Sequence, residues 1–434
     1  MNQFTFEAKT KNTLLGFMAL GVVCMLLTYF FGEPEQISVA HLHTRFWSNF
    51  LQNAIFFTGI AFISLFTLAA FTTAYAGWHV VFKRVWEAYS LFLIPGLILM
   101  LIVGAGIWGH FHHLYHWTDT EAVAADELLQ GKSGFLNKFW YTFGTLIIVG
   151  IWIFFAKKLR QLSVAEDNLA SGDYSLHNKA RIFAAAFLPI AAYSSAVILW
   201  EWLMSIDAHW FSTMFAWYAT ASWFVGAFAL TILTLVILKS RGYYQNVTRD
   251  HLHDLGKYMF AFSIFWTYLW FSQYMLIWFG NIGEETIYFK QRVDEYPVLF
   301  YGNLILNFAL PFLILMRNKT KRQYGTMIFT SALVFFGHWW DFFYMVKPGA
   351  LNTANEALAH HAGEHAQEAA HQASSFVAGF TIPGLLEIGT LFGFTAFFLF
   401  VVFNHLTKAS LVPGLDPYLE ESLHHEVEQD LSHG

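Results

Sequence analysis

The chain contains ten long apolar runs, and this pattern limits the fold more than any other feature of the sequence. A helix needs about 20 apolar residues to cross a bilayer, and lipid offers the backbone of such a run no partner other than its own helix. We therefore predict an all-α integral membrane protein that forms a single membrane domain over residues 1–434. The predicted spans are residues 13–31, 50–74, 89–109, 138–156, 181–203, 214–238, 257–280, 297–316, 325–346 and 380–404.

Composition supports a membrane protein and excludes several other classes. Of the 434 residues, 56% are hydrophobic and 12% are charged, which is unlike a soluble domain. The net charge of -6 gives no basis for nucleic-acid binding. Cys24 is the single cysteine, so the chain cannot form an intrachain disulfide, a thiolate metal cage or a C-x-x-C-H haem attachment. The first run is long for a signal peptide and lacks a cleavage motif, so we interpret it as a retained helix.

Basic residues are distributed unevenly between the two sides that ten spans define. The termini and the even-numbered connections carry 18 of the 24 Lys and Arg residues. The positive-inside rule then predicts that both termini are cytoplasmic. Residues 110–137 and 347–379 become outer loops, the second rich in His, Ala and Glu, and residues 405–434 an acidic cytoplasmic tail. Four spans contain prolines that should kink them, namely Pro95, Pro189, Pro311 and Pro383.

Residues 200–218 place ionisable side chains between two apolar runs, where a membrane helix would leave the lipid. Glu201, Asp207 and His209 are functional candidates, because charge at that depth is costly unless it is paired or lines a polar cavity. The alternative is that the polar residues cap helix ends and the tryptophans form an aromatic belt.

Further polar residues fall in the same outer half of the membrane when depth is counted at about 1.5 Å per helical residue. His338 and Asp341 share a helix face, where they can exchange a proton or simply hold helices together. Glu387 interrupts an apolar span and indicates a proton relay or a partnered polar contact. The sequence thus predicts one set of proton-transfer or quinone-facing candidates, which are Glu201, Asp207, His209, Gln273, His338, Asp341 and Glu387.

Other polar residues carry less specific expectations. Asn303 and Asn307, one turn apart, are expected to bond an adjacent helix or a quinone carbonyl. Glu87 is expected to be a solvated residue on the cytoplasmic side. The histidines at 110–116, and the pair at 361 and 365, lack the spacing of a specific metal site, so no metal ligands are predicted.

Two segments resemble a known family. MSIDAHWFSTMFAWY at residues 204–218, SQYMLIWFGNIGEETIYF at residues 272–289 and the ten-helix layout resemble the large membrane subunits of bacterial alternative complex III. Those subunits belong to the NrfD-like superfamily, which includes the polysulfide reductase membrane subunit. The GNIGEET segment makes this chain more similar to the F-type than to the C-type subunit.

The resemblance implies a place in a quinol oxidoreductase that passes electrons to cytochrome c or to a haem-copper oxidase. It implies two four-helix bundles, from spans two to five and six to nine, with one peripheral helix at each end. It also implies a second NrfD-like subunit, an iron-sulfur protein and c-type cytochromes as partners. Those partners would carry the haem c and the iron-sulfur clusters, with menaquinol as the substrate of the complex.

On this interpretation the chain is not an enzyme alone and holds no covalently bound cofactor. It contributes to the environment of a quinol site, to a proton pathway, or to both, although no motif transfers an individual quinol ligand onto it. The alternatives are a structural scaffold subunit of the same complex and a secondary transporter. A transporter would be marked by broken helices at corresponding positions of two halves, and the prolines do not pair in that way.

Overall fold

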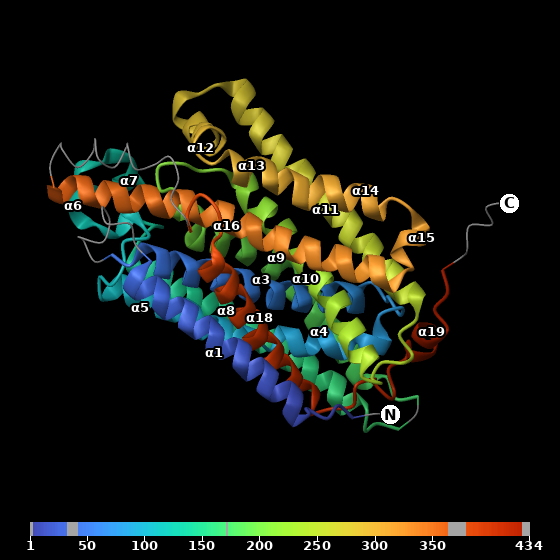
Figure 1. Cartoon of the computed structure of the whole chain (residues 1–434). Helices are drawn as coiled ribbons and strands as arrows, with labels where there is room; N and C mark the ends of the chain where they lie inside the picture. The colour runs from blue at the N-terminus through green and yellow to red at the C-terminus, as the bar shows by residue number, and fades with distance from the viewer. Residues whose placement is uncertain (1–2, 33–41, 171, 363–378, 428–434) are drawn as a thin grey trace.

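The computed structural model describes residues 3–32, 42–170, 172–362 and 379–427 (Figure 1). Within these ranges the fold is all-helical without a β-sheet, and Gln3 and Ser410 form an isolated bridge. The predicted all-α class is therefore confirmed.

In the part of the chain that the structure describes, eight helices are long and apolar enough to cross a membrane, so the chain has the character of a multi-pass membrane protein. The other two predicted spans lie on α11 (Arg249–Gly280) and α16 (Tyr324–Ala362), which are helical but richer in Trp, Tyr and polar side chains. The eight are α1 (Ala8–Phe31), α3 (Thr44–Thr73), η1 with α4 and α5 (Val80–Trp108), α8 (Lys138–Glu166), α9 with η3 (Ser175–Ile206), α10 (Thr213–Ser240), α13 with α14 (Pro297–Leu315) and α18 (Leu385–Leu406).

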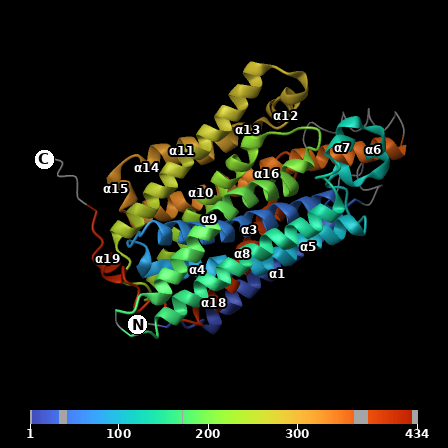
Figure 2. The ribbon, with the colours of Figure 1, turned by 180° about the vertical axis from the view of Figure 1, so that it is seen from behind.

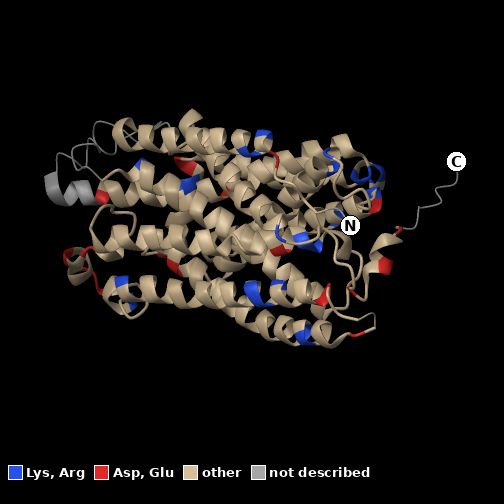
Figure 3. Ribbon diagram, turned by 90° about the horizontal axis from the view of Figure 1, so that it is seen from below, with Lys and Arg blue, Asp and Glu red and all other residues tan. Residues whose placement is uncertain are grey.

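The long helices run side by side along one axis, and both ends of the chain lie at the same end of the structure (Figures 1 and 2). We call this the terminal end. The short helices α6 (Thr120–Ala125) and α7 (Glu127–Lys132) mark the opposite end, which we call the loop end. Most of the ribbon between the two ends carries neither acidic nor basic residues (Figure 3).

The central helix is α3. In its most apolar stretch 83% of the residues are buried, against 28% in α1. It contacts α5 (Leu93–Trp108) and α9 as well as α10 and α16. Its approach to α10 is close, because a Cβ on Gly59 would overlap the Trp223 indole. Two hydrogen bonds join it to α16, from Gln52 Nε2 to the Trp339 carbonyl at 3.2 Å and from Trp339 Nε1 to Asn53 Oδ1 at 3.0 Å.

Glycines allow α1 to pack directly along α18. A Cβ on Gly21 would lie 2.5 Å from the Cα of Gly393, so the two backbones are in contact at this point. One turn along, a Cβ on Gly389 would lie 2.4 Å from Cys24 Sγ. Small residues at helix crossings are typical of membrane proteins, where close backbone approach supplies the packing energy.

Several predicted boundaries differ from the structure. α16 continues as a helix through Pro348 to Ala362 instead of ending at 346. The expected outer loop at 347–379 is therefore helical in its first part, and residues 363–378 lie outside the described ranges. The predicted outer loop at 110–137 contains α6 and α7. At the terminal end, the tail forms a short helix, α19 (Leu419–Leu423).

The prolines also differ in role. Pro189 lies inside α9 as predicted, and Pro95 lies in the first turn of α5. Pro311 follows a π-helical turn, Ile305–Ala309, that separates α13 (Pro297–Leu304) from α14 (Leu310–Leu315). Pro383 was expected to kink a span but precedes α18, where a residue without an N–H group is tolerated.

The glycine contact between α1 and α18 gives a test of the packing. We expect Gly393→Val to lower the thermal stability of the purified protein, since forcing two methyl groups against the α1 backbone costs about 1–3 kcal/mol. Thermal unfolding in detergent measures the effect. The matched control is Gly16→Val on α1, where an added Cβ meets no atom within 4 Å. Equal melting temperatures for the two variants would show that the helices do not pack in this way.

Candidate functional site

The best-defined buried polar site of the described residues surrounds Asp341 in the middle of α16. Asp341 is fully buried, and its carboxylate accepts hydrogen bonds from three other helices. Tyr218 Oη donates from α10, Trp266 Nε1 from α11 at 2.8 Å, and Asn303 Nδ2 from α13 at 2.6 Å. Four helices therefore converge on one carboxylate.

The π-helical turn at 305–309 positions the amides beside Asp341. Pro311 cannot donate to the carbonyl of Asn307 four residues earlier, and a π turn is one way to accommodate such a break. Asn307 Nδ2 donates to Asn303 Oδ1 at 2.5 Å and to the Gly337 carbonyl at 2.9 Å. A Cβ on Gly337 would lie 2.2 Å from Asn307 Oδ1, so only glycine permits this approach. The predicted interhelical role of both asparagines is confirmed.

His338 lies one turn from Asp341 but does not bond to it. Its Nδ1 lies 2.8 Å from Ser222 Oγ, and its buried Nε2 has no hydrogen-bond partner. Ser222 is also close to Asp341, so it lies between the two groups. The predicted His-Asp couple is thus connected through a serine hydroxyl and not through a direct hydrogen bond.

Glu387 lies at a separate site, where α18 begins near α3. Arg45 donates to both of its oxygens, at 2.8 and 2.9 Å, and Asn49 Nδ2 donates at 3.0 Å. Its carboxylate also accepts from the backbone N–H of Gly384 at 2.9 Å, as a helix-capping residue does. Of the two roles that the sequence left open for Glu387, these contacts show the partnered polar contact.

Asp207 and His209 form two further pairs at the loop end. Asp207 accepts from Arg292 at 2.8 Å, and the Arg292 guanidinium stacks on the Tyr288 ring at 3.4 Å. Arg292 belongs to α12 (Gly283–Asp294), which this ion pair fixes against the loop end. His209 Nε2 lies 2.6 Å from Asp126 Oδ2, and this hydrogen bond lowers the pKa of Asp126.

The last two candidates are buried without such partners. Gln273 is 4% exposed, and its Nε2 has no hydrogen-bond partner. Glu201 is 2% exposed, and neither of its carboxylate oxygens has one. The seven candidates therefore occupy separate places, and only His338 and Asp341 belong to one site.

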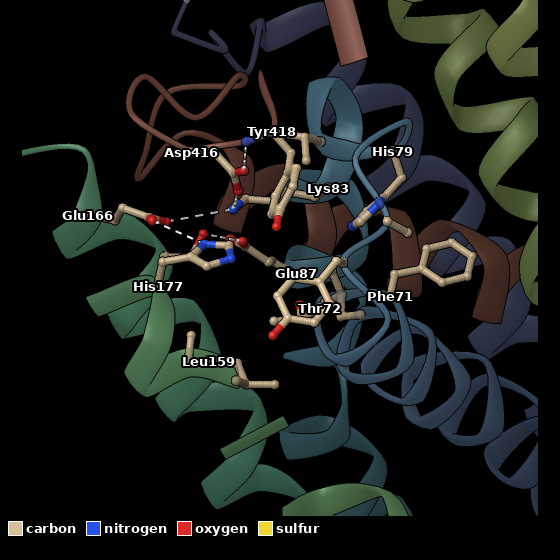
Figure 4. A pocket seen from close by; sticks show the side chains of 16 residues that line it. Phe71, Thr72, His79, Lys83, Glu87, Leu159, Glu166, His177, Asp416 and Tyr418 are labelled. Atoms are coloured by element: carbon tan, nitrogen blue, oxygen red, sulfur yellow. Dashed lines mark hydrogen bonds and ion pairs between the residues drawn. The ribbon is translucent and has the colours of Figure 1, made fainter. Parts of the chain in front are cut away.

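A second polar site at the terminal end was not predicted. A small cavity of about 50 Å³ is lined by Lys83, Glu166, His177 and Asp416, from α4 (Lys83–Ser90), α8, α9 and the tail (Figure 4). Lys83 Nζ donates to Asp416, and His177 Nδ1 lies 3.2 Å from Glu166 Oε1. Burial opposes ionisation of Asp416, but the nearby Lys83 charge outweighs it and lowers the pKa of Asp416.

Glu87 adjoins this cavity and corrects an expectation. It was predicted to be solvated, but it is 3% exposed and accepts from Arg84 at 2.9 Å, Arg160 at 3.1 Å and Ser163 at 2.6 Å. Lys83, Arg84 and Glu87 are spaced as neighbours on one helix face within an apolar stretch, a pattern that could have indicated a buried ionic site.

Glu166, His177 and Asp416 offer one donor atom each within 4.8 Å of one another, as metal ligands do. However, the Lys83 ammonium already supplies the positive charge that these carboxylates require. The donor set therefore fits a lysine-centred ionic cluster better than a metal ion. The side chains of His361 and His365 lie outside the described residues.

Comparison of the sequence with protein-family models and with curated proteins finds no match. The family therefore remains a resemblance carried by the two motifs at residues 204–218 and 272–289.

The contacts of Glu387 predict a loss of stability when its charge is removed. We expect Glu387→Gln to lower the melting temperature of the purified protein by the equivalent of about 3–5 kcal/mol, because Arg45, whose side chain is only 12% exposed, is left without its carboxylate. Glu284→Gln is the matched control, since Glu284 is exposed on α12. A Glu387→Gln variant as stable as this control would show that the pair contributes nothing.

Proposed function

We propose that this chain is a membrane subunit of a respiratory quinol oxidoreductase of the alternative complex III type. The two motifs support the proposal, and so do the eight membrane-spanning candidates. In the proposed topology α11 and α16 complete ten spans, and the terminal end faces the cytoplasm across a bacterial inner membrane. The placement of both termini at one end agrees with an even number of spans.

The proposed helix arrangement is two four-helix bundles. The contacts among α3, α5, α8 and α9 support the first bundle, and those among α10, α11, α13–α14 and α16 support the second. The peripheral helices, α1 and α18, pack against each other. Asp341 belongs to the last helix of the second bundle, and its three partners come from the other three helices of that bundle.

The observation that carries the functional proposal is the buried Asp341 carboxylate with His338 and Ser222 beside it. Quinol oxidation releases protons, and an ionisable residue inside a membrane points by default to a functional site. Asp341 has no exposed surface, so a quinol ring does not contact it directly. We therefore assign Asp341 to a proton pathway and not to direct ligation of quinol.

Hydroxyl groups extend from Asp341 towards the loop end. Tyr218 bonds to Asp341, and Tyr288 and Tyr344 lie close to Tyr218 and to Arg292. Tyr344 Oη is buried without a hydrogen-bond partner, which leaves it free to bond to a water or to a neighbouring hydroxyl. In the proposal, a proton moves between Asp341 and the outer face along these tyrosines, and Asp207 paired with Arg292 lies at the outer end.

The redox chemistry belongs to partner subunits in this proposal. A second NrfD-like subunit, an iron-sulfur protein and c-type cytochromes are the proposed neighbours, with menaquinol as the substrate of the complex and a haem-copper oxidase as one acceptor. The long helices expose large apolar side chains such as Phe139, Ile182 and Phe271, which fit lipid or other membrane subunits.

A scaffold role is the second candidate, and one observation favours it. All described partners of Asp341 come from neighbouring helices, as expected for a group that locks a bundle together. In that case, substitution of Asp341 impairs assembly before it affects turnover.

Asp341→Asn separates these roles. We expect it to reduce quinol-dependent turnover about tenfold or more, because proton-transfer groups contribute about 10²–10⁴-fold to rates, while the complex still assembles. Turnover of the purified complex and its subunit composition are measured together. Asp294→Asn, at an exposed position of α12, is the matched control. Full turnover in Asp341→Asn would remove the proton pathway, and loss of assembly would favour the scaffold.

Membership of a complex is tested by gentle purification through a tag on the carboxyl-terminal tail. We expect c-type haem spectra and an iron-sulfur subunit to co-purify, because the chain itself has no motif for either group. A colourless protein that remains intact and alone would contradict the proposal and favour a transporter.

A further inference from the structure

Glu201 is unlike the other buried carboxylates of the described residues. Both of its oxygens are buried without a hydrogen-bond partner, and no other described carboxylate has both oxygens in that state. Glu87 and Glu387, by comparison, are each bonded to arginine. An ionised carboxylate in this environment lacks both water and a partner, which costs several kcal/mol.

The helices around Glu201 supply no free cation. The helices packed against α9 are α3, α8 and α10. α3 has only Arg45 and α10 has only Lys239, whereas α8 has Lys138 at its start and Lys157, Lys158 and Arg160 in its second half, towards the terminal end. Arg45 is engaged by Glu387, and Lys239 Nζ donates to two backbone carbonyls, at 2.7 and 3.0 Å, near the terminal end.

The basic residues at the loop end that are nearest to Glu201 in sequence also have partners of their own. Lys138, at the start of α8, lies 4.7 Å from the centre of the Trp108 ring. Lys132 Nζ donates to the Ala208 carbonyl at 2.7 Å. Since no positive charge is available to stabilise a carboxylate at Glu201, the neutral acid is the form that fits this site.

The titratable groups that interact with Glu201 are two phenols, Tyr115 and Tyr141. Tyr115 Oη donates to the Trp202 carbonyl at 2.8 Å, and the buried Tyr141 hydroxyl lies close to that of Tyr115. A neutral carboxylic acid offers one donor and an acceptor oxygen, which matches a phenol. Glu201 is therefore placed among neutral groups that suit its protonated form.

A groove at the loop end brings the outer face within one helical turn of Glu201. Its volume is about 320 Å³, and Ser205 is among its lining residues together with Trp200, Met204 and Phe211. Ser205 follows Glu201 by four residues and donates to the Glu201 carbonyl at 2.5 Å. Phe211 is 58% exposed, which places it at the open side of the groove.

Glu201 also corresponds to Asp341 in the proposed bundles. Each acid lies on the last helix of its bundle, α9 or α16, and each directly follows a tryptophan, as Trp200-Glu201 and Trp340-Asp341. Two acids on equivalent helices suggest that each bundle contains its own proton-binding group.

We propose that Glu201 is a second proton-binding site. It is a neutral carboxylic acid in the resting protein, and it exchanges its proton with the outer face through the groove at Ser205, independently of Asp341. This site stands whether or not the protein belongs to a quinol oxidoreductase, because the burial and contacts of Glu201 support it without the comparison to Asp341.

The test uses dicyclohexylcarbodiimide, an apolar reagent that reacts with protonated carboxylic acids. The acid proton passes to a carbodiimide nitrogen, the carboxylate oxygen bonds to the central carbon, and the acyl group then migrates to nitrogen to give a stable N-acylurea. We expect mass spectrometry of the wild-type protein to find the adduct on Glu201. Glu387, which is ion-paired, stays unmodified. No adduct on Glu201, or equal labelling of Glu387, would overturn the proposal.

Two variants test the same site by a different measurement. Infrared spectra in H₂O and D₂O report the carbonyl band of a protonated carboxylic acid and its shift on exchange. We expect Glu201→Gln to remove one such band and to keep the wild-type melting temperature, since the amide has the shape of the neutral acid. Glu387→Gln should leave the band in place. A band unchanged in Glu201→Gln would show that Glu201 is not protonated.

Discussion

The cost of placing charge where water is absent governs every polar site in this structure. A buried ion loses several kcal/mol of hydration, and only a partner with good geometry restores it. Arg45 with Glu387 and Arg292 with Asp207 meet this condition with an ion pair. Asp341 instead accepts hydrogen bonds from three neutral donors. Glu201, as proposed above, avoids the cost because it stays protonated and carries no charge. The type of compensation therefore distinguishes ion pairs that fix helices from acids that can exchange a proton.

Counting along an apolar run predicts the depth of a residue in the membrane, but it does not predict which neighbouring helix the residue faces. Counting residues from the ends of the apolar runs placed the seven candidates in one half of the membrane. The structure distributes them over separate helix interfaces, because the face that a helix turns to its neighbours depends on tertiary packing. Only His338 and Asp341, which are neighbours on one helix, were grouped correctly by the sequence.

The sequence predicted which segments are helical, because a long apolar run in lipid can satisfy its backbone hydrogen bonds only as a helix. Each predicted span overlaps a helix, although residues 380–384 precede α18. The larger errors lie beyond the apolar runs, where lipid no longer restricts the chain. The extension of α16 to Ala362 and the short helices α6 and α7 lie beyond the apolar runs, where hydropathy gives no guidance. The ionic cluster near Lys83 was missed for a related reason, because its members come from α4, α8, α9 and the tail, far apart in sequence.

The central position of α3 separates the two acids that are proposed to bind protons. α3 contacts both α9, which carries Glu201, and α16, which carries Asp341. Beyond Arg45 it has no ionisable side chain, and Gln52 and Asn53, which face α16, are occupied by Trp339. Ser48 and Ser64 of α3 donate to carbonyls of α3 itself, so their hydroxyls do not join the two acids. In the proposal each acid exchanges its proton with its own side of the structure, Asp341 along the tyrosines of the second bundle and Glu201 through the groove at Ser205.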